Sequence, residues 1–191
     1  MFGISVLVFW STGLLAYFNG RSLLAPFQIY IDQSDIYDNM WLDISSIWLL
    51  VGDDYESLKT YAIVLALCIC GIGLYLILSG KKKLDSPETY LNTAGWFVWT
   101  CILFLPAMHD RYAYLLDILL LLLCFLNICY VKYAFISICF SLISYGHFLF
   151  GNDGLDTWNA VIFLAAWLHY SYYIISGAYK IKNGNSQNTA S

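Results

Sequence analysis

Six long apolar runs follow one another along this chain, and they constrain its fold more than any other feature. They cover residues 2–18, 60–79, 90–105, 112–131, 133–150 and 157–179. A membrane-spanning helix needs about 20 mainly apolar residues, and most of the runs approach that length. Only 12% of the residues are charged, whereas soluble domains carry about 25%. We therefore predict an all-α fold, a polytopic transmembrane helix bundle of about six spans.

The distribution of charge predicts how this bundle is oriented. Loops rich in lysine and arginine stay in the cytoplasm. When the runs are counted as alternating spans, one side receives Lys81, Lys82, Lys83, Lys132, Lys180 and Lys182. The other side receives Asp32, Asp35, Asp38, Asp43, Asp53, Asp54, Glu56, Asp110, Asp153 and Asp156. We therefore predict an integral membrane protein whose two termini both lie in the cytoplasm.

The runs also predict the division of the chain. Residues 1–182 form a single transmembrane domain, with an extracytoplasmic loop at about 19–59 after the first span, and the polar residues 183–191 form a disordered cytoplasmic tail. The first run lacks a basic n-region and a small-residue cleavage site, so we interpret it as a retained span and not a signal peptide. The apolar piece 44–51 is too short to span, and an interfacial helix or a re-entrant segment fits it better.

A charged segment lies between the third and fourth runs. Arg111 is always cationic and offers a planar fork of donors, which suits phosphate recognition at a membrane surface. His109 could donate to the same phosphate or shuttle a proton. If a helix begins at Asp110, Asp117 lies on the same face about 10 Å away, where it must face other helices or water. The alternative is that Arg111, Asp110 and Asp117 simply pair with one another or with interfacial water.

Other polar residues leave both a functional and a structural interpretation open. The acidic side chains of the outer loop could hold a divalent cation or bind sugar hydroxyls, or could be an exposed acidic surface. His169, near the middle of the last run, could have a function in the membrane, or could be packed against a tyrosine or a carbonyl group. His147, near the outer end of the fifth run, is less informative.

Composition and motifs exclude several classes of function. The net charge is −4 and there is no basic stripe interleaved with aromatic residues, which argues against a nucleic-acid partner. The six cysteines lie inside or at the ends of apolar runs, and none pairs with a histidine at zinc-ligand spacing. We therefore interpret them as small hydrophobic residues and predict no metal site. No Ser-His-Asp arrangement, HExxH pair or phosphate-binding loop is present.

Two segments of the chain carry a family resemblance. The first reads Pro106-Ala107-Met108-His109-Asp110-Arg111-Tyr112 and continues with Tyr114-Leu115 and Asp117. The second, in the outer loop, comprises Pro26-Phe27, Tyr30, Gln33, Tyr37, Leu42 and Ile47-Trp48. They resemble the PKMHERY-F-Y-L-A-D segment and the P-F-x-x-Y-x-x-Q-x-x-x-Y loop of bacterial polytopic glycosyltransferases of the GT-C type. These enzymes are often described as mannosyltransferases related to the GPI-anchor enzymes.

The resemblance implies transfer of a sugar from a polyprenyl-phosphate donor to a glycan or lipid acceptor outside the cytoplasm, at the bacterial plasma membrane. It implies that a carboxylate acts as general base and that the configuration at the anomeric carbon of the sugar inverts. The residues that it places at the donor lipid phosphate are His109, Arg111 and Tyr112. The residues that it places in supporting or acceptor-side positions are Gln33, Tyr37, Asp43, Asp110 and Asp117. It leaves the cofactor open, with a divalent cation as one option.

The chain departs from the family pattern at several positions. The family lysine is Ala107, the family glutamate is Asp110, and the family Asn-Ala-Pro-Asn is Asp43-Ile44-Ser45-Ser46. Enzymes of this type have many more spans, with the catalytic acid in the first outer loop. The chain therefore resembles their C-terminal half, and the catalytic residue is not assigned.

Three functional hypotheses follow. The chain is the C-terminal part of a GT-C glycosyltransferase and needs an N-terminal half as its partner. Alternatively, it is a non-catalytic accessory protein or remnant in cell-wall or surface-polysaccharide assembly that retains the lipid-phosphate site. A third class is a small transporter or channel in which Asp117 and His169 line a path. The sequence leaves open whether the chain is an enzyme.

Overall fold

The computed structural model describes residues 2–22, 24, 28, 38–79, 86–151 and 153–187, and these residues are mostly helical. The chain divides into two compact units, Met1–Asp38 and Asn39–Ser191, which are described separately. Lys81 to Lys83, on which the predicted orientation depends, lie outside the described residues.

The N-terminal unit contains the first apolar run. It forms two helices, α1 (Phe2–Thr12) and α2 (Leu14–Phe18). Gly13 separates them: its N–H donates to the Trp10 carbonyl at 3.0 Å, and its own carbonyl accepts from the Tyr17 N–H at 3.1 Å. The run is therefore helical but interrupted, where the sequence predicted one continuous span.

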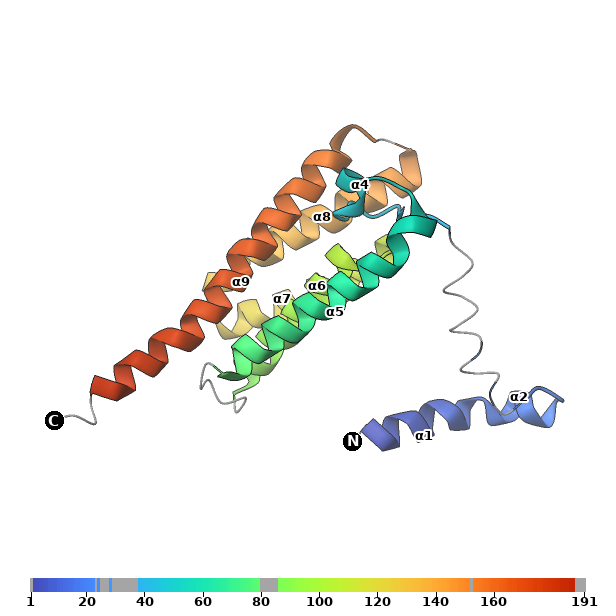
Figure 1. Ribbon diagram of the computed structural model, residues 1–191, viewed down its shortest axis with the longest axis horizontal. Helices are drawn as coiled ribbons and strands as arrows, with labels where there is room; N and C mark the ends of the chain where they lie inside the picture. The colour runs from blue at the N-terminus through green and yellow to red at the C-terminus, as the bar shows by residue number, and fades with distance from the viewer. Residues whose placement is uncertain are drawn as a thin grey trace. The chain divides into compact units, whose positions relative to one another are not determined.

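The second unit is a bundle of helices joined by short turns. Its elements in chain order are β1 (Trp41–Leu42), α4 (Trp48–Val51), α5 (Tyr55–Ser79), α6 (Pro87–Phe104), β2 (Met108–His109), η1 (Asp110–Tyr112), α7 (Ala113–Leu126), η2 (Ile128–Tyr130), α8 (Val131–Phe150), η3 (Asp153–Leu155) and α9 (Asp156–Gln187). Helix α6 packs against α5, α7 and α9, and α8 packs against α7 and α9 (Figure 1). We call the end of the bundle that carries β1, β2, η1 and η3 the strand end.

Local sequence explains where these helices begin and end. Ser86 caps α6, accepting a hydrogen bond from the Thr89 N–H at 3.2 Å, and Pro87 occupies the first turn. The same helix ends at Phe104 because Leu105 precedes Pro106 and is extended, with ψ 143°. Helix α8 ends at Phe150, and Gly151 follows with a φ of 62°, in the left-handed region that glycine adopts without steric cost.

Aromatic rings fill the centre of the bundle. Trp99 of α6 is fully buried and lies beside Phe163 and Tyr170 of α9, with ring centroids 5.0 and 5.4 Å apart. Phe163 also stacks on Phe140 of α8 at 3.5 Å. Such rings bury large areas and hold α6, α8 and α9 together.

Two indole N–H groups beside this core, those of Trp96 and Trp167, have polar partners, whereas that of the buried Trp99 has none among the described residues. Trp96 of α6 donates to the Ser171 hydroxyl of α9 at 2.7 Å, and Trp167 of α9 donates to the Thr100 hydroxyl of α6 at 3.0 Å. A buried indole N–H without a partner would cost about 1–3 kcal/mol. These reciprocal bonds therefore fix the register of α6 against α9.

A network of side-chain hydrogen bonds joins the helices at the end of the bundle opposite the strand end. Tyr170 donates to the Asn92 carbonyl oxygen, the Asn92 amide donates to the Tyr130 hydroxyl, and Tyr130 donates to the Glu88 carboxylate, each at 2.8 Å. Lys132 is exposed near this end. The network links α9, α6 and η2, and it satisfies polar groups that would be costly to bury alone.

The five later runs all form helices, although their lengths differ from the prediction. Within the described residues, two segments are long and apolar enough to cross a membrane, Tyr55–Ser79 and Ile128–Phe150. Helix α7 has 14 residues and ends at Leu126, earlier than the sequence predicted. At 1.5 Å per residue it is about 21 Å long, shorter than the hydrocarbon core of about 30 Å. The fold class is therefore helical as expected, and the number of spans stays a prediction.

Two other expectations concern short segments. The apolar piece 44–51 does contain a short helix, α4, which packs against α9. Helix α9 continues to Gln187 and so reaches into the segment 183–191 that was expected to be a tail.

We expect Gly73→Ala to destabilise the bundle. A Cβ at Gly73 would lie 2.6 Å from Cζ2 of Trp96, and closer still to the tip of that ring, so α5 and α6 would have to separate. Overpacking of this kind costs about 1–3 kcal/mol. The matched control is Gly71→Ala on the same helix, where a Cβ meets nothing within 4 Å. Unfolding in detergent should show a lower midpoint for the first variant and an unchanged or higher one for the second; equal midpoints would contradict this packing.

Candidate functional site

The described end of the outer-loop segment meets the charged segment in space. Strand β1 pairs in parallel with β2, with Trp41 opposite Met108 and Leu42 opposite His109. The Ala107 N–H donates to the Met40 carbonyl at 3.0 Å and extends the pairing by one step. Residues of the outer loop and of the charged segment, far apart in the sequence, therefore form one small two-stranded sheet.

The backbone is strained on both sides of this sheet. Asp43 follows β1 and Ala107 precedes β2, and both have a φ of 54°. Among the described residues they are the two non-glycine residues with positive φ. Non-glycine residues in this region cost about 1–3 kcal/mol each and persist where the surroundings fix them, often at functional sites. Aspartate tolerates the conformation better than alanine does, because its side chain can hydrogen-bond locally.

Hydrogen bonds anchor the sheet to the ends of α5 and α6. The Met40 N–H donates to Asp53 Oδ1 at 2.6 Å, just before α5 begins. The Trp48 indole N–H donates to the Phe104 carbonyl at 3.1 Å. Phe104 is the last residue of α6, so this bond satisfies a carbonyl group that the helix itself leaves without a partner.

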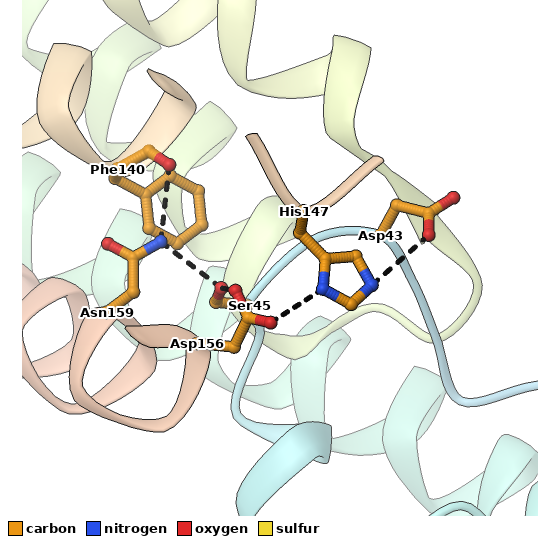
Figure 2. A network of polar contacts seen from close by, with 6 residues as sticks. All are labelled: Asp43, Ser45, Phe140, His147, Asp156 and Asn159. Carbon is orange, nitrogen blue, oxygen red and sulfur yellow. Dashed lines mark hydrogen bonds and ion pairs between the residues drawn. The ribbon is translucent and has the colours of Figure 1, made fainter. Parts of the chain in front are cut away.

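A histidine links two carboxylates beneath β1. His147 of α8 lies with Nε2 3.6 Å from Asp43 Oδ1 and with Nδ1 2.7 Å from Asp156 Oδ2 (Figure 2). The second contact has ion-pair distance without the alignment of a hydrogen bond. Asp156 is 4% exposed, whereas the Asp43 side chain is 37% exposed. The chain of contacts thus runs from a buried carboxylate, through an imidazole, to a carboxylate that solvent can reach.

The same buried carboxylate holds the loop after β1. Ser45 donates its hydroxyl to Asp156 Oδ1 at 3.3 Å and accepts from the Asn159 amide at 3.1 Å. Asn159 also donates to the Phe140 carbonyl at 3.2 Å (Figure 2). Asp156 is the first residue of α9, where a negative charge is favoured by the helix dipole. The loop is therefore fixed to both α8 and α9 by buried polar contacts.

The residues expected at the donor phosphate lie on and just after β2. His109 is half-buried, and its ring meets that of Tyr112 edge-on at 5.9 Å. Arg111 and Tyr112 are exposed, and Arg111 makes no ion pair with any residue in the described part of the chain. Asp110 is 6% exposed. The guanidinium of Arg111 is therefore open to a ligand from outside the chain.

No α-helix begins at Asp110, although the sequence pattern allowed one there. Residues 110–112 form a 3-10 turn and α7 begins at Ala113. Asp117 faces α8, as expected for a carboxylate in an apolar helix, and accepts from the hydroxyls of Ser137 at 2.5 Å and Ser141 at 2.6 Å. Those two bonds give Asp117 a role in packing α7 against α8, apart from Arg111.

The other residues that the sequence singled out, Gln33, Tyr37, Asp43 and His169, have different outcomes. Gln33 and Tyr37 lie outside the described residues, and Asp43 is part of the histidine network. His169 Nδ1 lies 2.7 Å from the Tyr133 hydroxyl, which fits the packing interpretation. No group of three or more His, Cys, Asp or Glu side chains among the described residues is arranged to hold a metal ion. The six cysteines are free thiols.

Sequence reasoning missed His147, Asp156 and Asn159 as a unit. Each is unremarkable alone, because a histidine at the end of an apolar run and an acid after it are common. The available signal was topological: alternating spans put the end of the fifth run, the start of the sixth and the outer loop on one side. The contacts between these residues join parts of the chain that are far apart in the sequence, and no local sequence pattern predicts them.

Comparison with protein-family models, with curated proteins and with solved structures gave no match. The GT-C resemblance stays a prediction from the two segments described above.

We expect Asp156→Asn to loosen the loop 40–48 without unfolding the bundle. The amide cannot offer two acceptor oxygens to Ser45 and His147, and an unsatisfied buried group costs about 1–3 kcal/mol. Hydrogen exchange read by mass spectrometry should become faster in both 40–48 and 105–112, because β1 and β2 share one ladder. Glu56→Gln, at an exposed acid in the first turn of α5, is the control. Unchanged exchange, or faster exchange in only one of the two segments, would contradict the coupling.

Proposed function

We propose that this chain is an integral membrane protein in which the helices of the bundle span the bilayer and the strand end faces away from the cytoplasm. The apolar composition and the two membrane-length helices support this reading. The distribution of charge supports the orientation. Lys132 lies at the end opposite the strand end, on the side that the positive-inside rule assigns to the cytoplasm, whereas the strand end carries Asp43, Asp110 and Asp156 beside Arg111.

We further propose that the chain supplies the lipid-phosphate-binding part of a GT-C type glycosyltransferase. The observation that carries this proposal is the pairing of β1 with β2. The two segments that resemble the family are independent in sequence, and a shared site requires that they meet. Their contact places the outer loop beside His109 and leaves Arg111 exposed at the same end of the bundle.

The residues at this end have suitable chemistry for a phosphate monoester or diester. Arg111 offers two parallel N–H donors to phosphate oxygens, with greater strength than a neutral donor provides. His109 and the hydroxyl of Tyr112 supply further donors on the same turn. When an acceptor hydroxyl attacks the anomeric carbon and the bond from that carbon to the phosphate oxygen breaks, negative charge grows on the departing polyprenyl phosphate. A fixed cation there stabilises the transition state more than the ground state.

In this proposal the general base that takes the proton of the acceptor hydroxyl belongs to a partner part of the enzyme, an N-terminal transferase half. The alternative function is a non-catalytic accessory protein of cell-wall or surface-polysaccharide assembly that binds the same lipid phosphate. One observation favours the alternative. Ala107, where the family has lysine, brings no charge to the site although its backbone is held in a strained conformation.

Binding of polyprenyl phosphate tests the shared element of both readings. We expect the chain in lipid nanodiscs to bind undecaprenyl phosphate, and Arg111→Gln to weaken binding about 10–100-fold, because a charge-assisted hydrogen bond contributes about 1.5–3 kcal/mol. Arg111→Lys should recover part of the affinity, since it restores the charge without the bidentate fork. Lys132→Gln, at the opposite end of the bundle, is the matched control. Equal binding by the Arg111 and Lys132 variants would refute the site.

Sugar transfer in membranes then separates the two readings. If the chain is part of the transferase, removing it should abolish transfer from a polyprenyl-phosphate sugar, and the Arg111→Gln variant should restore little of the activity. If transfer persists without the chain while undecaprenyl phosphate still binds to it, the accessory reading is correct.

A further inference from the structure

We propose that Asp43, Trp41 and His147 form a binding site for a pyranose ring, and that this ring is part of the acceptor glycan. The assignment to the acceptor rests on the proposed function, whereas the sugar site itself rests on the contacts that follow. Carbohydrate rings present hydroxyl groups around their rim and a patch of C–H bonds on one face. A protein recognises them with carboxylate acceptors beside an aromatic ring.

Asp43 provides the carboxylate. Its side chain is 37% exposed, and within the described residues His147 is its polar partner, through Oδ1 at 3.6 Å. An ionised carboxylate can accept about four hydrogen bonds, so most of its capacity remains for a ligand. Two neighbouring hydroxyls of a sugar match the spacing of two carboxylate oxygens, which makes this group a suitable acceptor for a vicinal diol.

Trp41 provides the aromatic surface. It begins β1, and Asp43 follows that strand directly. His147 brings the two side chains together, because the Trp41 ring centroid lies 6.0 Å from that of His147, the residue that also contacts Asp43. Trp41 is only partly buried. A partly exposed indole beside a partly exposed carboxylate matches the two faces of a sugar, with C–H groups on the ring and hydroxyls on the oxygens.

The rest of the network holds these groups in place. His147 is held from behind by the buried Asp156 at 2.7 Å, and Asp156 is held in turn by Ser45 at 3.3 Å. The strained φ of 54° at Asp43 directs the chain from β1 into the buried loop. Groups fixed in this way lose little entropy when a ligand binds, which favours recognition of weakly binding sugars.

The location also fits an acceptor. The sugar site lies on β1 and the expected phosphate site on and after β2, and Leu42 is paired with His109 between them. A donor phosphate held by Arg111 and an acceptor sugar held by Asp43 would thus approach each other across one two-stranded sheet, as a transfer reaction requires.

Saturation-transfer NMR on the full chain in nanodiscs, without any polyprenyl phosphate, tests the sugar site. The probes are the methyl glycosides of mannose, glucose and galactose. At least one should receive saturation on its ring protons, and Asp43→Gly should reduce that signal at least fivefold. Glycine adopts the positive φ of Asp43 without strain, so this variant removes the side chain and keeps the backbone. Asp43→Asn, which keeps the shape but not the charge, should bind about tenfold more weakly than the unchanged chain.

Glu56→Gln is the control for loss of a surface charge and should bind the glycosides as the unchanged chain does. Hydrogen exchange in 40–48 must stay unchanged in Asp43→Asn, which shows that the loop is still docked. Saturation of none of the three glycosides, or equal signals from Asp43→Asn and the unchanged chain, would overturn the proposal and leave Asp43 as a purely structural contact. Failure of undecaprenyl phosphate to bind would instead refute the proposed function, and the sugar site would stand on its own measurement.

Discussion

The parallel pairing of Trp41–Leu42 with Met108–His109 is the contact on which the rest of the site depends. A sheet with two residues in each strand is too small to be stable alone. It persists because the loop that follows β1 is buried against the bundle, with Ile44, Ser45 and Ser46 at 2% exposure or less. The polar contacts of Asp156 and Asn159 satisfy Ser45 there, so the helices hold the loop and the loop holds the strand.

The side chains that hold the helices together differ from those that are exposed at the strand end. Aromatic stacking and reciprocal indole bonds join α6 to α9, and the Asp117 contacts join α7 to α8. None of those groups needs a ligand. At the strand end, by contrast, Arg111 is exposed, Asp43 is partly exposed and the backbone is strained on both sides of the sheet. Groups that are open to solvent yet fixed by buried partners are what a binding site on a rigid bundle requires.

Much of the fold could be predicted from the sequence, because long apolar runs are a local signal. Each run forms a helix, and the departures include the break at Gly13, the early end of α7 at Leu126 and the continuation of α9 to Gln187. The candidate site was only partly predictable. Arg111 and His109 stand out as charge between apolar runs, and Asp43 was included through the family resemblance. Strands of two residues show no alternation, so the β1–β2 pairing left no pattern to read. The contacts of His147 with Asp43 and Asp156 depend on that pairing and on the packing of α8 against α9.

The outer loop and the charged segment form one unit through the β1–β2 pairing, and disulfide cross-linking tests this unit most directly. In a background with the native cysteines replaced by alanine, Trp41→Cys combined with Met108→Cys places two thiols at directly paired positions. Paired strands lie about 4.8 Å apart, within the range of about 4.4–6.8 Å between Cα atoms that a disulfide accepts. We expect rapid cross-linking of this pair under mild oxidation in membranes, and none when Trp41→Cys is combined with Tyr114→Cys, at an exposed position on α7. Absence of the first cross-link, or equal formation of both, would contradict the account.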